Sequence, residues 1–219
     1  MSTIRVSAFR WVPPFAQGLV RDLRVRWALE EAGLAYEERL IGREDQLSEA
    51  YLNLQPFGQV PAYEEGELVL FESGAIVLHI AERSDALMPS DPGARARTKT
   101  WMFAALNTVE PPIMFLNMLD RRQDGDAAAK ALRLAAVGEI KKRLASLRSR
   151  LDGREYIEDR FTAADLLMTT VLRILRDTDL VAEIPVLEAY CQRCEARPAF
   201  RKALAGQMAP FIANAQPKM

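Results

Sequence analysis

The segment NLQPFGQVPAYEEGELVLFESGAIVLHIAER, residues 53–83, carries the strongest structural signals in the chain. Two short runs of β-branched and aromatic residues, 60–65 and 67–72, are separated only by residues around Glu65 and Gly66. Such spacing is typical of an antiparallel hairpin. Ser73 is a good N-cap residue, so a helix is expected from Ser73 to Arg83. The segment therefore predicts two strands followed by a helix.

The residues before this segment predict a β-α-β unit. IRVSAF at 4–9 and AYEERLI at 35–41 have strand character, and LRVRWALEEAG between them is a helix that Gly33 closes in a left-handed conformation. A β-α-β unit implies a right-handed crossover and parallel strands. Residues 43–54 are irregular or helical. Together these elements form a thioredoxin-like plan of about eighty residues, a small mixed sheet covered by helices.

The rest of the chain has helical periodicity. Apolar residues recur every three or four positions across 127–151, which indicates an amphipathic bundle helix. Residues 95–120 form a long helix or a broken pair, because Pro111 and Pro112 force a kink or a break. The Pro-, Asp- and Ser-rich stretch before them reads as a linker. The expected domains are a thioredoxin-like α/β domain at 1–83, a linker at 84–94 and an all-α helical-bundle domain at 95–219.

Composition narrows the functional classes. The chain has 219 residues, 49% of them hydrophobic, and a net charge of −1. No overall field would draw it to nucleic acid or to an anionic membrane, so we expect neither as a partner. It has no N-terminal leader pattern and no apolar stretch near eighteen residues, which favours a soluble, cytoplasmic protein.

The small number of cysteine and histidine residues makes a metal site unexpected. The chain has two cysteines and one histidine. Cys191 and Cys194 have redox spacing, but they lie in a late helical segment and are expected to pack inertly. His79 lies between apolar neighbours in the helix from Ser73, where a structural role is expected.

Val60-Pro61 is the first candidate binding motif. A proline that opens a strand cannot donate a ladder hydrogen bond and is a candidate for a cis peptide bond. A cis bond would turn the N–H and C=O of Val60 outward, where an extended peptide could pair with them. The alternative is an edge-strand proline with no ligand.

Glu72-Ser73 is the second candidate motif, at the end of a strand and the start of a helix. The amides of the first helical turn and the helix dipole favour a carboxylate there. Glu72 could hold an ammonium group, so the pair would bind the head group of an α-amino acid. Alternatively, Ser73 only caps the helix and Glu72 lies in solvent.

These features, in this order, resemble the soluble glutathione S-transferase family over essentially the whole chain. They are the strand-helix-strand unit, QPFGQVPA, LFESGAI, a linker, a helical second half and FTAAD at 161–165. Thr162 and Asp165 within FTAAD have the spacing of a capping box, whose role is structural. We expect a bacterial member with an atypical N-terminal active-site loop.

The resemblance also implies roles in glutathione binding. It implies that Pro61 is cis, that Val60 pairs with the cysteinyl backbone of glutathione, and that Glu72 and Ser73 bind its γ-glutamyl end. Gln59 and Gln46 match polar positions near its glycyl end.

The group that activates the thiol is not obvious from the resemblance. The family usually lowers the thiol pKa with a Tyr or Ser hydroxyl, and some branches place a Cys or Asn nearby. The loop FRWVPPFAQGLVRD, residues 9–22, has no Ser, Thr, Tyr or Cys, and alignment of the following helix puts Arg21 and Asp22 at the expected position. Helix amides together with Arg21 or Gln17 as a hydrogen-bond donor would be enough to lower the thiol pKa. Asp22 has the wrong charge for this and is expected to be a cap or a structural partner. The alternative for Arg21 is a solvated side chain.

The same loop is rich in apolar residues. Trp11 and Phe15 flank two prolines and could line a pocket for the electrophile. The other residues expected in this pocket are Trp101, Asn107 and Met114. The alternative for Trp11 and Phe15 is a core or dimer contact. We therefore expect a homodimeric glutathione S-transferase that uses glutathione as co-substrate with a small apolar electrophile. The alternatives are a binding protein of the same fold with little turnover, or a glutathione-dependent reductase, isomerase or dehalogenase.

Overall fold

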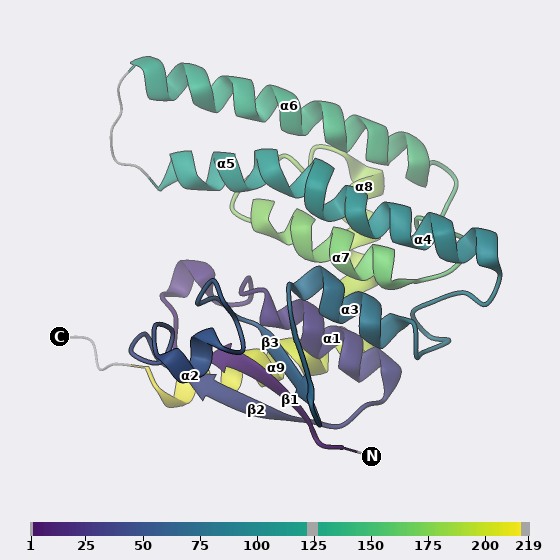
Figure 1. Cartoon of the computed structure of the whole chain (residues 1–219). Helices are drawn as coiled ribbons and strands as arrows, with labels where there is room; N and C mark the ends of the chain where they lie inside the picture. The colour runs from purple at the N-terminus through teal and green to yellow at the C-terminus, as the bar shows by residue number, and fades with distance from the viewer. Residues whose placement is uncertain (1, 122–126, 216–219) are drawn as a thin grey trace. The chain divides into compact units, whose positions relative to one another are not determined.

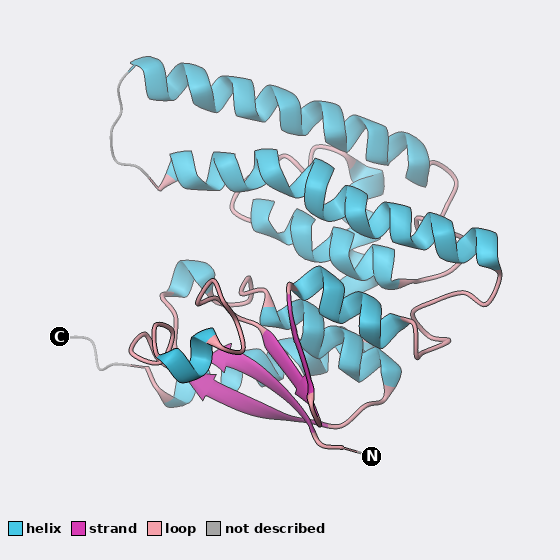
Figure 2. Cartoon of the chain, in the orientation of Figure 1, coloured by secondary structure: helices cyan, strands magenta, loops and turns pink. Residues whose placement is uncertain are grey.

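A four-stranded sheet organises the first part of the chain in the computed structural model, which describes residues 2–121 and 127–215. The strand order is β2-β1-β3-β4 (Figures 1 and 2). β1 (Ile4–Phe9) runs parallel to β2 (Tyr36–Ile41) and antiparallel to β3 (Ala62–Glu65), which forms a hairpin with β4 (Leu68–Phe71). The predicted parallel pair and hairpin are both confirmed.

Helices α1 (Asp22–Ala32) and α3 (Ser73–Ala81) pack against each other beside this sheet. Trp27 of α1 and Ile76 of α3 are fully buried in the core. Gly33 ends α1 with φ 66°, a left-handed conformation that glycine adopts at low cost, as the sequence predicted. The unit also contains the short helices η1 (Pro14–Ala16) and α2 (Glu49–Leu52).

The second part of the chain is helical. α4 (Pro92–Ala104), the π-helix η2 (Ala105–Val109) and α5 (Glu110–Asp120) follow one another without a break. Pro111 and Pro112 lie in the first turn of α5, and the wider π turn before them accommodates the proline rings and the missing N–H donors. The kink-or-break prediction is thus realised as a π turn.

Three more helical elements complete this unit after α6 (Ala127–Leu151). They are α7 (Ala163–Leu172), η3 (Arg173–Leu175) and α8 (Pro185–Glu195). α7 packs against α4 and α8. The predicted capping box at its start is confirmed, because Asp165 accepts a hydrogen bond from the Thr162 amide at 2.9 Å and Thr162 Oγ1 accepts one from the Ala164 amide at 3.3 Å. The thioredoxin-like α/β part followed by an all-α part is the fold class that the sequence predicts.

The last helix, α9 (Pro198–Ala213), packs against α1. The compact units are Met1–Met88 with Arg197–Met219, and Pro89–Ala196. The sequence-based division of the domains at 83 and 94 stays a prediction, and it differs from these compact units in the place of α9. Contacts between α9 and α1, which lie far apart in the sequence, cause that difference.

Across residues 2–121 and 127–215, none of the helices combines the length and the apolar character that a membrane span requires.

Candidate functional site

The strand register brings three backbone segments to one end of the sheet. Val6 on β1 lies opposite Tyr63 on β3, and Ala62 lies opposite Phe71 on β4. The residues just before Ala62 and just after Phe71 therefore lie near the C-terminal end of β1 (Figure 1). The three segments are Val60-Pro61, Glu72-Ser73 and the loop that leads from β1 into α1.

The Val60-Pro61 peptide bond is cis. The polar backbone groups on either side of it are held within the protein, since the Gln59 carbonyl accepts a hydrogen bond from the Tyr51 hydroxyl at 2.6 Å. On the other side, the Ala62 amide donates to Ser7 Oγ at 2.7 Å. The cis prediction is confirmed, and the flanking bonds give the segment a defined position.

Gln46 and Gln59 lie close to this segment. The Gln46 side chain donates to the Gly58 carbonyl at 2.8 Å, so it joins the α2 loop to the residues that precede Val60. Gln59 is exposed. Their predicted place near the glycyl end of a bound peptide stays a prediction.

The backbone at Glu72 is strained. Glu72 has φ 68° and ψ 111°, outside the usual range of a residue with a side chain, and it is exposed at the cap position of α3. Strain of this kind costs about 1–3 kcal/mol and persists where the surrounding structure or a function requires it. Glu72 is therefore a candidate functional residue on geometry as well as on sequence.

Ser73 is the first helical residue of α3 and not its cap, so that prediction was wrong by one position. Its hydroxyl is buried and accepts a hydrogen bond from Arg24 Nη1 at 3.3 Å. The first-turn amides of a helix have no partner within the helix, and they favour an anion. With the Arg24 guanidinium alongside, the start of α3 carries positive electrostatic potential that suits a carboxylate.

Arg21 immediately precedes α1 and is half-buried, so it is not a fully solvated side chain. Gln17 Nε2 donates to the Val12 carbonyl at 3.0 Å, which braces the loop. Asp22 is fully buried and binds Arg26 Nε through Oδ2 at 2.7 Å. Burial raises the pKa of Asp22, while Arg26 opposes that shift. Asp22 is thus the structural partner that its charge predicted.

The aromatic residues of the loop have exposed side chains. Trp11 is 38% exposed and Phe15 52% exposed, so they are not core contacts. Trp101 lies on α4, Asn107 on η2 and Met114 on α5, all in the second unit. The predicted electrophile pocket formed by both groups stays a prediction.

Three side chains that sequence analysis passed over support the candidate site. Ser7 and Tyr51 hold the cis segment, and Arg24 reaches Ser73. Helical spacing gives a signal for Arg24, because it shares a face of α1 with the buried residues Trp27 and Ala28. For Ser7 the only local signal is a hydroxyl inside an otherwise apolar stretch of strand.

The remaining candidates are structural. His79 lies against Tyr63 and contacts Arg83 and Glu65 at the surface. Cys194 is buried, and burial raises the pKa of Cys191 far above its usual range, which disfavours the reactive thiolate. Among the described residues, His, Cys, Asp and Glu side chains form no group of three or more that could hold a metal ion.

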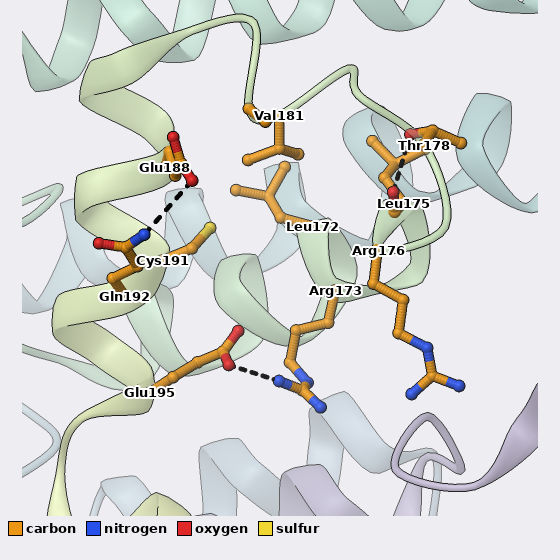
Figure 3. Close-up of a pocket in the computed structure, with 11 residues that line it drawn as sticks. Leu172, Arg173, Leu175, Arg176, Thr178, Val181, Glu188, Cys191, Gln192 and Glu195 are labelled. Atoms are coloured by element: carbon orange, nitrogen blue, oxygen red, sulfur yellow. Dashed lines mark hydrogen bonds and ion pairs between the residues drawn. The ribbon is translucent and has the colours of Figure 1, made fainter.

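A hollow of about 260 Å³ lies within the second unit, between η3 and α8 (Figure 3). Leu172 and Val181 form an apolar wall, and an ion pair between Arg173 and Glu195 at 2.6 Å lies at another side. None of the predicted site residues lines it.

Comparison with known families gives two matches along the chain. The glutathione S-transferase N-terminal domain matches residues 17–82, and the glutathione S-transferase C-terminal domain matches residues 100–198. A glutathione S-transferase of Hyoscyamus muticus is 32% identical over 83% of this chain and 92% of its own. Glutathione S-transferase 4 of Zea mays is 30% identical, with 98% of each chain covered.

Solved structures agree with these matches. A glutathione transferase from Pseudomonas putida, with one glutathione disulfide bound per subunit, has a TM-score of 0.79 at 25% identity and covers 93% of this chain and 91% of its own. A glutathione transferase from Burkholderia graminis, with two glutathione molecules per subunit, has a TM-score of 0.80 at 27% identity, with 93% and 88% covered. Because these relatives come from plants and bacteria, a bacterial source stays a prediction.

Proposed function

We propose how this chain, which belongs to the glutathione S-transferase family and is a glutathione transferase, binds glutathione and activates its thiol. The tripeptide lies in an extended conformation along Val60-Pro61, where its cysteinyl backbone pairs with the N–H and C=O of Val60 as a short added strand. The observation that carries this proposal is that the strand register brings the Val60-Pro61 segment and the strained Glu72 together at one end of the sheet.

The γ-glutamyl head group binds at the start of α3. Its carboxylate accepts hydrogen bonds from the first-turn amides and the Ser73 hydroxyl, and the buried Arg24 adds favourable charge. Glu72 binds the ammonium group. Gln46 and Gln59 contact the glycyl end, so both charged ends of the peptide are recognised and the thiol is directed between them.

Activation of the thiol requires a moderate preference for the thiolate. A thiol pKa near 8.5 must fall by roughly two units, or about 2.7 kcal/mol, for the thiol to be mostly ionised at neutral pH. A helix N-terminus supplies about 0.3–2 kcal/mol and a charge-assisted hydrogen bond about 1.5–3 kcal/mol. On these magnitudes, the start of α1 together with Arg21 or the side-chain amide of Gln17 as donor is sufficient.

The other parts of the proposal rest on the family and on exposed apolar surface. Trp11 and Phe15 contact a small apolar electrophile together with Trp101, Asn107 and Met114. The protein acts as a cytoplasmic homodimer, with glutathione as co-substrate and without a metal.

A titration of the glutathione complex by ultraviolet thiolate absorbance tests the proposal. The wild type should show thiolate below about pH 8, and Arg21→Ala should raise the thiol pKa by about one unit. Arg10→Ala is a matched control, because Arg10 lies in the same loop but pairs with Glu44 at 3.1 Å at the surface. An unchanged pKa in Arg21→Ala would remove Arg21 from the mechanism.

A second function is favoured by one observation, the absence of Ser, Thr, Tyr and Cys from residues 9–22. A glutathione-binding protein with little turnover would need no thiolate. Tight glutathione binding without thiolate below about pH 8 would support that function and contradict the first.

A further inference from the structure

Helix α9 runs antiparallel to α1 and contacts it at both ends. Near the start of α9, Arg197 forms two hydrogen bonds to the Glu31 carboxylate, at 2.6 and 2.7 Å, close to the C-terminal end of α1. Ten residues further along α9, Gln207 lies against Asp22, the first residue of α1. The last helix in the chain therefore spans the length of the first one.

The contact at the start of α1 is made by one fully buried side chain. Gln207 is 0% exposed, and its Nε2 donates to the Val20 carbonyl at 3.0 Å and to Asp22 Oδ1 at 2.7 Å. The Val20 carbonyl also accepts the Leu23 amide at 3.0 Å. Gln207 thus bridges the two sides of the turn that contains Arg21.

The amide of Gln207 is only partly satisfied. Its oxygen is buried and has no hydrogen-bond partner within the part of the chain that the structure describes. A buried polar group with an unpaired atom costs stability that an apolar side chain of similar size would avoid. The favourable contribution of Gln207 is therefore in its two donated bonds, both of which end at the turn into α1.

We propose that Gln207 is a positioning residue for thiol activation. It holds the turn from Val20 to Asp22 in place and so orients Arg21 and the first amides of α1. The inference rests on the proposed function of Arg21. A hydrogen bond weakens steeply as its geometry departs from the optimum, and the effect of a helix terminus is confined to its first turn. Small shifts of this turn therefore change the thiol pKa. All but the first residue of α9 lies outside the two family matches, which end at residue 198.

The test compares Gln207→Met with Arg197→Met in the full chain with glutathione. Gln207→Met removes both donated bonds at similar side-chain length, whereas Arg197→Met breaks the contact at the other end of the same helix pair. We expect the pKa of bound glutathione's thiol to rise by about one unit in Gln207→Met and to stay unchanged in Arg197→Met. Below about pH 6, where the bound thiol is protonated in both variants, glutathione affinity should stay within about twofold of the wild type, because the variants are expected to change only the preference for the thiolate.

Hydrogen exchange in the ligand-free protein gives a second readout. The amides of Leu23 and Arg24 should exchange faster in Gln207→Met but not in Arg197→Met. If Gln207→Met does not fold, Gln207→Asn retains a buried amide that is too short to reach both acceptors, and it should shift both readouts in the same direction by less.

The possible results distinguish a failure of this inference from a failure of the proposed function on which it rests. A normal wild-type thiolate with an unchanged pKa in the Gln207 variants overturns the inference and leaves the proposed function standing. A wild-type complex with no thiolate below about pH 8 overturns the proposed function, and the inference with it. Equal pKa shifts in Gln207→Met and Arg197→Met would also overturn the inference, because general loss of stability would then explain them.

Discussion

The hydroxyl groups of Ser7 and Tyr51 lie 2.8 Å apart, buried beneath the cis bond at Val60-Pro61. Each hydroxyl has one hydrogen to donate, and Tyr51 gives its hydrogen to the Gln59 carbonyl. Ser7 must therefore donate to Tyr51 while it accepts from the Ala62 amide. One directed chain of three hydrogen bonds thus brackets the two residues that we assign to glutathione binding.

Ser7→Ala should weaken both the fold and glutathione binding. The change leaves the buried Ala62 amide without an acceptor and the Tyr51 oxygen without a donor, which should lower the free energy of unfolding by about 2 kcal/mol. Urea unfolding measures the first effect, and calorimetry with glutathione measures the second. Ser48→Ala is a control, since its loss of the α2 cap to the Tyr51 amide should cost about 1 kcal/mol without changing affinity. Unchanged affinity in Ser7→Ala would contradict the role of the chain of bonds.

Glu72 should show opposite effects on stability and on binding. Glu72→Gly removes the strain at φ 68° and should stabilise the fold by about 1 kcal/mol, whereas Glu72→Ala retains the strain and should not. Both changes remove the carboxylate and should reduce glutathione affinity about tenfold or more. Thermal unfolding and calorimetry on the two variants separate strain from charge. Wild-type affinity in both would show that Glu72 does not bind the ammonium group.

Glu65 should make the fold sensitive to acid. Hydrogen bonds from Arg83, together with one from Tyr63, lower the pKa of Glu65 from its usual value near 4.5 to about 2. A carboxylate whose pKa is lowered in the folded state stabilises that state above pH 4.5, and this contribution is lost as the pH falls from 4.5 toward 2. Its size should be of the order of 1 kcal/mol, because the pair is near the surface and solvent screens it.

Urea unfolding at several pH values measures this effect. Glu65→Gln should flatten the fall in stability between pH 4.5 and 2. Glu139→Gln, which breaks an exposed pair with Lys142 at 2.6 Å, should change the profile little. Parallel pH profiles for the wild type and Glu65→Gln would show that Glu65 is not the responsible group.

Local signals were enough to predict most of the elements. The hydrophobic period of residues 127–151 predicts the α6 helix, and Gly33 ends α1 where a left-handed residue was expected. The cis bond at Val60-Pro61 followed from a proline at a strand start together with the family resemblance. Such signals succeed because residues within a few positions of each other determine the backbone conformation there.

The errors and omissions concern contacts between distant residues. Ser73 has the chemistry of a cap, yet the strained backbone at Glu72 shifts the cap by one position. In the sequence, Arg24 is one of several arginines on the same helix. Packing of α1 against α3 buries it beside Ser73.

The amino-acid sequence was sufficient to identify the α/β and helical parts, the parallel strand pair and the hairpin, because these depend on short-range periodicity and turn chemistry. The binding roles of Val60-Pro61 and Glu72-Ser73 came from the family resemblance and stay predictions. Tertiary structure alone decided how those motifs are held. Ser7 reaches Ala62 across 55 positions and Gln207 reaches Asp22 across 185. Hydrogen bonds over such separations depend on where folded elements meet, and no local pattern of residue types encodes that geometry.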